Sequence, residues 1–338
     1  MTDRTETIES FICDAGWQFA VRSSLAGDAS PRRYDRLRRG TPPYQAVLMD
    51  APKETGESVI PFLTVGSYLL KQGFSAPEIY AQDIQNGLIL LEDMGDDLLA
   101  RVCAQDPELE RLTYSASVGT LVALQNCKLL PDVPAYDTDV YLREANLLTD
   151  WYLPAATGEP VGAVKQAEYS DLIGRACAGI AAQKPCLVLR DYHAENLLWL
   201  PLRKDARRIA LLDFQDALIG HPAYDLVSLL EDARRDTTTT LRHEMIDRYL
   251  NATGHNRTSF MRAYATLGAQ RNLKIIGIFS RLYLRDGKCG YLDLIPRVWA
   301  HLQNDLSHPD LSDLRKWVIN NVPPPVRQTL SQIRDRLS

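Results

Sequence analysis

The sequence lacks several features that would assign it to whole classes of protein. It has no apolar run near the roughly 18 residues of a membrane-spanning helix, and residues 1–6 are polar, unlike the start of a secretory signal. Its net charge of −5 provides no general basic field for nucleic acid or anionic lipid. We therefore expect a cytoplasmic protein that binds neither nucleic acid nor a membrane.

Cysteines are few and scattered. Six occur in 338 residues, with no C-x-x-C pair and no metal-site spacing. Several have apolar neighbours, as is typical of buried free thiols, and this favours a reducing compartment. The sequence also lacks internal repeats and low-complexity linkers. With 45% hydrophobic and 24% charged residues it has the composition of a globular protein, and its length suits one large or two medium domains.

The spacing of apolar residues predicts two regions of different structure. Strand-like runs at 46–49, 79–80 and 87–91 accompany helical patterns at 8–15 and 58–72. Beyond residue 93 the patterns are mainly helical, with helices expected from residue 106 and near 139–152, 168–183, 222–235, 239–251, 258–284, 292–304 and 324–336. We therefore predict an α+β fold of two lobes. The N-terminal lobe, 1–93, has a small antiparallel sheet with one main helix, and the larger C-terminal lobe, 94–338, is mostly helical.

Two short strand-like runs in the second region are each followed by an acidic residue. The run 187–189 precedes Asp191 and Asn196, which are five residues apart, and the run 209–212 precedes Asp213. Phosphoryl transfer from a nucleotide requires a carboxylate to accept the hydroxyl proton, and amide and carboxylate oxygens to hold Mg²⁺. The alternative is that these are ordinary turn residues at strand ends. Their order and context favour kinase chemistry.

In this order the motifs resemble the aminoglycoside phosphotransferase and choline kinase superfamily, relatives of the protein kinases, over most of the chain. The resemblance implies a protein-kinase-like fold with ATP and Mg²⁺ as cofactors. It also implies that Asp191 is the catalytic base and that Asn196 and Asp213 are magnesium ligands. Within residues 221–226, Asp225 would support the catalytic loop by accepting backbone N–H groups.

Three segments, 27–34, 48–52 and 270–279, are similar to the bacterial anomeric sugar kinases that act in cell-wall recycling. This narrower resemblance implies phosphorylation of N-acetylmuramate or N-acetylglucosamine at the anomeric hydroxyl.

Four residues are candidates for contact with such a sugar. Tyr192 and His193 adjoin the base, while Arg271 and Asn272 lie in a polar cluster within an apolar helix. Arg271 and Lys274 are three residues apart and can point the same way, so either could pair with a substrate carboxylate. The alternative for this cluster is a solvated helix face, and the alternative for His193 is a role in ordering the loop.

Other residues are expected to bind the nucleotide. Gly27, Ala29 and Ser30 belong to a turn in which glycine permits close backbone approach to phosphate, although a plain hairpin turn has the same composition. Backbone groups of Glu92 and Met94 would bind the adenine edge, unless this segment is only an interlobe linker.

Met49 is the main departure from the kinase pattern. It stands where kinases place the phosphate-binding lysine of Val-Ala-Ile-Lys, while remaining close to the nucleotide. Another cation must then neutralise the phosphates, and Arg33 is favoured over Lys53 because it follows the turn. No helix glutamate is clearly placed to pair with that cation, and Glu57, near a helix start, is a poor candidate.

Two other functions are considered. An aminoglycoside- or choline-type kinase is the nearest alternative, but a pocket for polycationic antibiotics should be lined with acids rather than Arg271 and Lys274. A pseudokinase that serves as a binding module is suggested by Met49, although the presence of the base and both metal ligands counts against it. The sequence does not indicate an oligomeric state.

Overall fold

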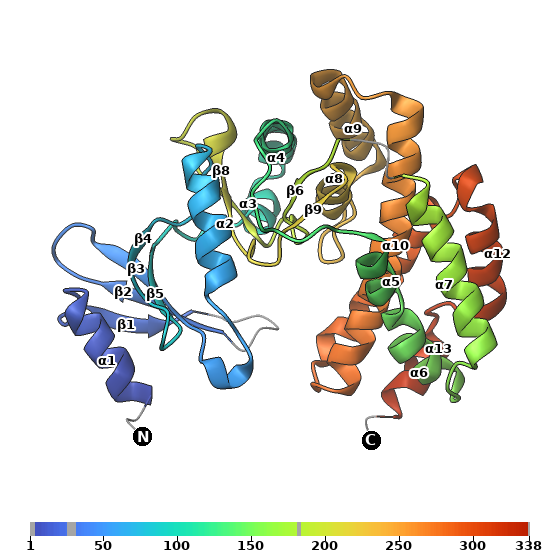
Figure 1. The fold of residues 1–338 in the computed structure, drawn as a ribbon, viewed down its shortest axis with the longest axis horizontal. Coiled ribbons are helices and arrows are strands. Elements are labelled where there is room, and N and C mark those ends of the chain that lie inside the picture. Colours follow the sequence, from blue (N-terminus) through green and yellow to red (C-terminus); the bar gives the residue numbers. More distant parts are fainter. Residues whose placement is uncertain (1–3, 26–31, 181–183, 337–338) are drawn as a thin grey trace. The chain divides into compact units, whose positions relative to one another are not determined.

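The computed structural model describes residues 4–25, 32–180 and 184–336, which form two compact units (Figure 1). Unit 1 comprises Met1–Ala116 and Glu195–Ala217, and unit 2 comprises Ser117–Ala194 and Leu218–Ser338. The boundary predicted at residue 93 lies inside the first segment of unit 1. A sheet-containing unit and a mainly helical unit confirm the predicted α+β fold.

Unit 1 is built on a five-stranded antiparallel sheet in the order β1-β2-β3-β5-β4. The strands are β1 (Val21–Ser24), β2 (Arg33–Arg38), β3 (Gln45–Asp50), β4 (Ile79–Asp83) and β5 (Leu88–Glu92). The central strand β3 and its neighbour β5 are the most apolar, and both were predicted from their apolar runs. Their side chains are buried on both faces, so something covers each side of the sheet.

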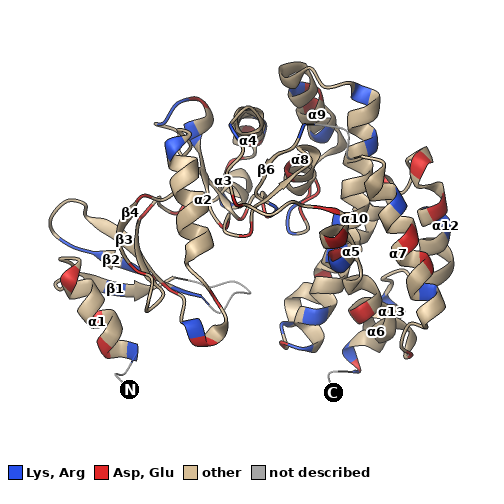
Figure 2. Ribbon diagram, viewed as in Figure 1, with Lys and Arg blue, Asp and Glu red and all other residues tan. Residues whose placement is uncertain are grey.

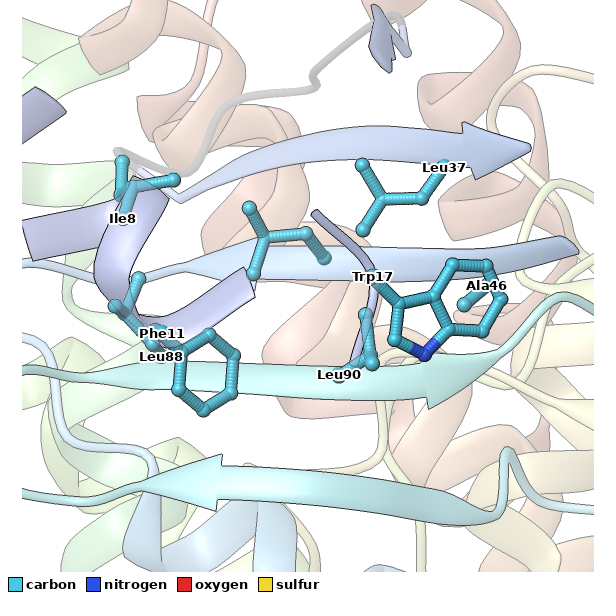
Figure 3. Close-up of a cluster of buried hydrophobic side chains, with 8 residues drawn as sticks. Ile8, Phe11, Trp17, Leu37, Ala46, Leu88 and Leu90 are labelled. Atoms are coloured by element: carbon cyan, nitrogen blue, oxygen red, sulfur yellow. The ribbon is translucent and has the colours of Figure 1, made fainter. Parts of the chain in front are cut away.

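Helix α1 (Arg4–Asp14) covers one face of this sheet. Ile8 and Phe11 point from the helix into an apolar cluster that Trp17 completes (Figure 3). The sheet contributes Leu37, Ala46, Leu48, Leu88 and Leu90 to the same cluster. We call this side the α1 face.

Side chains alternate along a strand, so the opposite face is also fixed by register. Tyr34 pairs with Met49, and Met49 with Ile89, one residue out of step with the α1 face. We call this side the Met49 face. It carries Met49, which we expect from the sequence to lie close to the nucleotide.

Helix α2 (Ile60–Lys71) is the main helix of unit 1 and closely matches the helix predicted over 58–72; α1 and α2 flank the sheet in Figure 1. The remaining elements are η1 (Lys53–Thr55), α3 (Leu99–Gln105), η2 (Pro107–Leu109), the hairpin β7 (Leu197–Trp199) and β8 (Ile209–Leu211) with η4 (Asp205–Arg208) between them, and the start of α4 (Glu110–Gln125). The helix expected from residue 106 opens as a 3₁₀ turn, since the Asp106 side chain accepts a hydrogen bond from the Glu108 amide.

Helices form most of unit 2, with one two-stranded sheet of β6 (Cys186–Val188) and β9 (Leu218–Gly220). The helices are α5 (Thr138–Ala145), the π-helical η3 (Leu148–Tyr152), α6 (Leu153–Thr157), α7 (Ala163–Ala178), α8 (Ala223–Leu230), α9 (Thr239–Thr253), α10 (Arg257–Leu284), η5 (Cys289–Leu294), α11 (Ile295–Asp305), η6 (Pro309–Leu311), α12 (Ser312–Asn321) and α13 (Arg327–Arg334). The 28-residue α10 is the longest of these, and most of its side chains are buried.

Surface helices of unit 2 carry charges of both signs. Helix α7 carries both basic and acidic residues (Figure 2), and Arg175 lies 3.0 Å from Asp171 one turn away. Within the described part of the chain, no helix has the combination of length and apolarity needed to cross a bilayer.

Candidate active site

The β7–β8 hairpin of unit 1 brings together the two predicted magnesium ligands. Asn196 precedes β7 and Asp213 follows β8, and the backbone amide of Leu212 donates to the Asn196 carbonyl at 3.0 Å. The Asn196 side-chain Nδ2 donates to Asp213 Oδ2 over 3.3 Å. Gln215 Nε2 donates to the other oxygen of Asp213 at 2.7 Å. One carboxylate is therefore held between two side-chain amides at the end of the hairpin.

This donor set suits Mg²⁺. A half-turn of the Asn196 amide presents its oxygen beside the Asp213 carboxylate, and hard oxygen ligands are what magnesium prefers. Among the residues that the structure describes, no group of three or more His, Cys, Asp or Glu side chains could hold a metal by itself. A site of one amide and one carboxylate, completed by phosphate oxygens and water, is the usual pattern for nucleotide-bound magnesium.

The backbone holds Asp213 in an uncommon conformation. Its φ of 54° lies in the left-handed region, which non-glycine residues rarely occupy. The next residue, Phe214, is fully buried and stacks on Phe62 of α2 with 4.9 Å between ring centroids. Packing of Phe214 therefore fixes the turn that exposes the Asp213 carboxylate, and such strain is common at functional sites.

Asp191 lies in unit 2, in the loop after β6. The carboxylate of Asp225, on α8, accepts backbone hydrogen bonds from Leu189 at 2.7 Å and from Arg190 at 2.9 Å. Arg190 also has a left-handed φ of 71°, and its guanidinium pairs with Glu144 on α5. The loop is thus fixed from α8 by backbone bonds and from α5 by an ion pair, with Asp225 in the supporting position that the resemblance implies.

The electrostatic surroundings of Asp191 keep it ionised. Burial works against the charged form, but the positive charges of Lys274, Arg190 and Arg271 outweigh it and lower the pKa of Asp191. A carboxylate in this state can accept a proton or a hydrogen bond from a hydroxyl throughout the neutral range.

Arg271 and Lys274 are both buried on α10, near Asp191. Lys274 Nζ lies 3.0 Å from Glu144 Oε1, and Arg271 donates to Ser228 Oγ at 2.8 Å. A solvated helix face, the alternative drawn from the sequence, does not apply because these side chains are enclosed. Buried cations near Asp191 provide an anion-binding potential in unit 2.

The other predicted sugar contacts have structural partners. Tyr192 is 1% exposed and donates to the Ser117 carbonyl at 2.9 Å. Asn272 is completely buried and donates to Glu231 and Asp305, each at 2.9 Å. These contacts favour roles in packing for both residues. His193 is also buried, which lowers its pKa, and its backbone amide donates to the Asp191 carbonyl at 3.1 Å.

The segment after β5 carries the predicted adenine-binding backbone. The Glu92 amide is used within the sheet region, donating to Glu78 at 2.8 Å, while the Met94 amide has no hydrogen-bond partner among the described residues. Arg36, buried on β2, clamps this segment by donating to Asp93 and Asp96, each at 2.9 Å. Arg36 thus holds the segment in a conformation in which the Met94 backbone amide can donate a hydrogen bond to a ligand.

The predicted phosphate-binding residues that the structure describes are not gathered in one place. Gly27, Ala29 and Ser30 lie outside the described residues. Met49 is fully buried on β3. Arg33 pairs with Asp50 in the sheet register, which puts it on the α1 face, so the structure separates it from Met49.

Arg32, which the sequence analysis did not single out, forms an ion pair with Glu57 at 2.6 Å. Glu57, considered a poor candidate for the glutamate partner, is thus paired with a neighbouring arginine. The missing signal was register: counting alternate residues back from Tyr34, the partner of Met49, leads to Arg32 rather than Arg33.

Similar proteins of known sequence cover nearly the whole chain. A Caulobacter vibrioides protein named N-acetylmuramate/N-acetylglucosamine kinase is 35% identical over 364 residues, spanning 97% of this chain and 99% of that protein. A Pseudomonas aeruginosa protein of the same name is 32% identical and spans 90% of each chain.

Solved structures share the fold at much lower identity. A choline/ethanolamine kinase family protein from Mesorhizobium loti has a TM-score of 0.62 and 14% identity, covering 98% of this chain and 99% of that one. An ADP-bound aminoglycoside phosphotransferase has a TM-score of 0.60 and 16% identity, covering 89% and 97%. The kinase-like fold is therefore confirmed. The model of the phosphotransferase enzyme family matches residues 22–264, and the chain belongs to this family.

Proposed function

We propose that this phosphotransferase uses ATP and Mg²⁺ to phosphorylate the anomeric hydroxyl of N-acetylmuramate or N-acetylglucosamine. The observation that carries the proposal is the 35% identity, across 97% of this chain, to the Caulobacter vibrioides protein named N-acetylmuramate/N-acetylglucosamine kinase. The arrangement of charges in unit 2 supports it, since buried cations near Asp191 suit an anionic sugar better than a polycationic antibiotic.

Asp191 is the proposed proton acceptor. The cations around it hold its pKa low, so it is a weak base. An anomeric hydroxyl is more acidic than an ordinary alcohol, so a weak base is sufficient and orientation of the hydroxyl matters more than basicity. Asp225 and Glu144 fix the loop that carries this carboxylate.

Asn196 and Asp213 would hold Mg²⁺, which when bound neutralises charge on the phosphates of the nucleotide. Their part is to offer one amide oxygen and one carboxylate at a hairpin end fixed by Phe214. The backbone of Glu92 and Met94 would recognise the adenine edge, on a segment that Arg36 holds in place.

Arg271 is the proposed contact for the lactyl carboxylate of N-acetylmuramate. Its guanidinium is 4% exposed and donates to the uncharged Ser228 hydroxyl, so its charge can serve an incoming carboxylate. N-acetylglucosamine lacks that carboxylate. The enzyme should consequently prefer N-acetylmuramate, and Arg271→Met should reduce the preference by raising KM for that sugar alone.

A substrate panel tests the proposal. ADP formation is measured with N-acetylmuramate, N-acetylglucosamine, choline and kanamycin in parallel. A reducing-sugar assay then follows the same reactions, because phosphorylation at the anomeric carbon removes the reducing end. We expect ADP and loss of reducing sugar in equal amounts with the two amino sugars. ADP without loss of reducing sugar would place the phosphate elsewhere, and turnover only with choline or kanamycin would refute the proposal.

A further inference from the structure

Met49 leaves the Met49 face of the sheet without the lysine that binds phosphates in related kinases. The described residues near this face include one arginine with a glutamate partner. Arg32 directly precedes β2, two residues before Tyr34, and Tyr34 pairs with Met49 across the strands. Alternation therefore puts Arg32 on the side of the sheet that Met49 faces.

Electrostatic interactions of Tyr34 link Arg32 to the hairpin that carries the proposed magnesium ligands. The Tyr34 side chain interacts with the guanidinium of Arg32 and with the carboxylate of Asp213. Burial raises the pKa of Tyr34, the Arg32 charge opposes this increase, and the Asp213 charge adds to it. The phenol is thus within electrostatic range of both the cation and a proposed magnesium ligand, all within unit 1.

The Arg32–Glu57 pair resembles the lysine–glutamate pair of protein kinases, because each joins a basic side chain to a glutamate. Its N···O distance is 2.6 Å, and the two side chains are 8% and 23% exposed. Glu57 lies just before α2, whereas the kinase glutamate is carried by the helix itself. An arginine also offers several donors in one plane, so it can bind a carboxylate and a phosphate oxygen together.

We infer that Arg32, held by Glu57, is the cation that binds the nucleotide phosphates in place of the lysine replaced by Met49. This inference rests on the proposed use of ATP, but not on the identity of the sugar. Arg32 is a binding residue in it, and Glu57 a positioning residue that acts through Arg32.

The sheet provides a matched control. Arg22 on β1 pairs with Asp35 on β2, also at 2.6 Å, and register places both on the α1 face. Arg22→Ala therefore removes an arginine–carboxylate pair of equal length from the opposite side of the same sheet. Arg33→Ala removes the neighbouring charge. Its effect can be compared directly with that of Arg32→Ala, because Arg33 is the cation that the sequence favoured.

Calorimetric binding of MgADP and of adenosine provides the decisive readout. Arg32→Ala should weaken MgADP binding by roughly ten- to a hundredfold, the loss expected for charge-assisted hydrogen bonds to phosphate. Adenosine has no phosphate, so its affinity should not change. Arg32→Lys should recover part of the MgADP affinity, and Arg22→Ala should bind both ligands like the unmodified protein.

Steady-state kinetics test the positioning role of Glu57. Glu57→Gln should raise KM for ATP while leaving KM for the sugar unchanged, whereas general loosening of the fold would change both. The inference is overturned if Arg32→Ala, with an unchanged melting temperature, binds MgADP normally, or if Arg33→Ala causes the larger loss. Should Arg32→Ala fail to fold, the comparison of Arg32→Lys with Arg33→Lys decides between the two residues.

These outcomes separate the inference from the proposed function. If the unmodified protein binds MgADP but phosphorylates no amino sugar, the sugar assignment fails while the binding comparison still tests Arg32. If it phosphorylates the sugar and Arg32→Ala does so with the same KM for ATP, the role of Arg32 fails alone.

Discussion

At the scale of single residues, the charge on Asp191 depends on its neighbours. A buried carboxylate is normally driven toward its neutral form, yet three positive side chains of unit 2, Lys274, Arg190 and Arg271, keep this one ionised. Two of them, Arg190 and Lys274, also share the carboxylate of Glu144. Glu144 therefore stabilises two of the cations that in turn stabilise the Asp191 carboxylate.

Replacing Asp191 with Asn should leave the fold intact and nearly abolish turnover. The amide keeps the shape but cannot accept the proton, so kcat should fall by about a thousandfold or more. KM for ATP should change little. Steady-state ADP release measures the effect, with circular dichroism as the control for folding. A variant that retains a tenth of the activity would exclude Asp191 as the base.

Replacing Asp213 with Asn should act through magnesium. Loss of the carboxylate should raise the Mg²⁺ concentration for half-maximal activity by about tenfold or more and lower kcat. Asp216→Asn, which removes the same charge from an exposed position three residues along, serves as the control. Equal magnesium titrations for the two variants would contradict the assignment.

At the scale of elements, a histidine caps the start of α8, the helix that carries Asp225. His221 Nδ1 accepts a hydrogen bond from the Ala223 amide at 3.1 Å, which requires that nitrogen to be unprotonated. Burial, with a smaller contribution from His255, lowers the pKa of His221 from 6.5 to about 4. The folded state thus binds this proton less well than the unfolded chain.

Acid should therefore weaken the protein through His221. Stability that His221 supplies is complete above pH 6.5 and is lost progressively as the pH falls toward 4. Between pH 7 and pH 5 the loss from this residue should be about 2 kcal/mol. Urea unfolding at both values measures it. His221→Asn, which can still accept from the helix and does not titrate, should lose less; an equal loss would contradict the linkage.

A glycine sets the closest approach of α10 to the rest of unit 2. A Cβ on Gly277 would lie 2.2 Å from the carbonyl carbon of Leu147, a backbone atom that cannot move aside. Gly174 on α7 differs, because a Cβ there would meet only Leu142, at 3.9 Å. The same substitution should therefore have opposite effects on the two helices.

We predict that Gly277→Ala lowers the free energy of unfolding by about 3 kcal/mol or prevents folding, since overpacking against backbone cannot relax. Gly174→Ala should raise it by about 0.5 kcal/mol because alanine favours the helix. Thermal and urea unfolding of both variants check this. A stable Gly277→Ala protein would show that α10 can shift.

At the scale of the whole molecule, the fold was largely predictable from sequence. Buried runs identified β3 and β5, and strand ends brought Asn196 and Asp213 together because both lie at one end of a hairpin. Helices α3 and α12, of 7 and 10 residues, were not predicted.

Side-chain partners were less predictable than elements. Arg32 and Arg33 are adjacent identical residues, and only the pairing of β2 with β3 distinguishes their faces. The sequence suggested Asn272 as a sugar contact, but its side-chain amide donates to two buried carboxyl groups of unit 2, Glu231 and Asp305. Both outcomes depend on tertiary contacts between segments far apart in sequence, which local patterns do not encode.

The cysteines should report on the integrity of the whole chain. Cys13 and Cys289 are exposed, Cys127 is partly buried, and the other three are buried, with burial raising the pKa of Cys177 to about 12. A thiol reagent should modify two groups quickly, Cys127 more slowly, and the remaining three only in denaturant. Rapid reaction of all six in the folded protein would contradict this arrangement.

Met49 also has a practical consequence for chemical labelling. Electrophilic nucleotide analogues identify kinases by acylating the amine beside the phosphates, and a thioether is not acylated. A cell-wide survey with such reagents would find no target at this position and could overlook the enzyme, whereas the variant Met49→Lys would restore one.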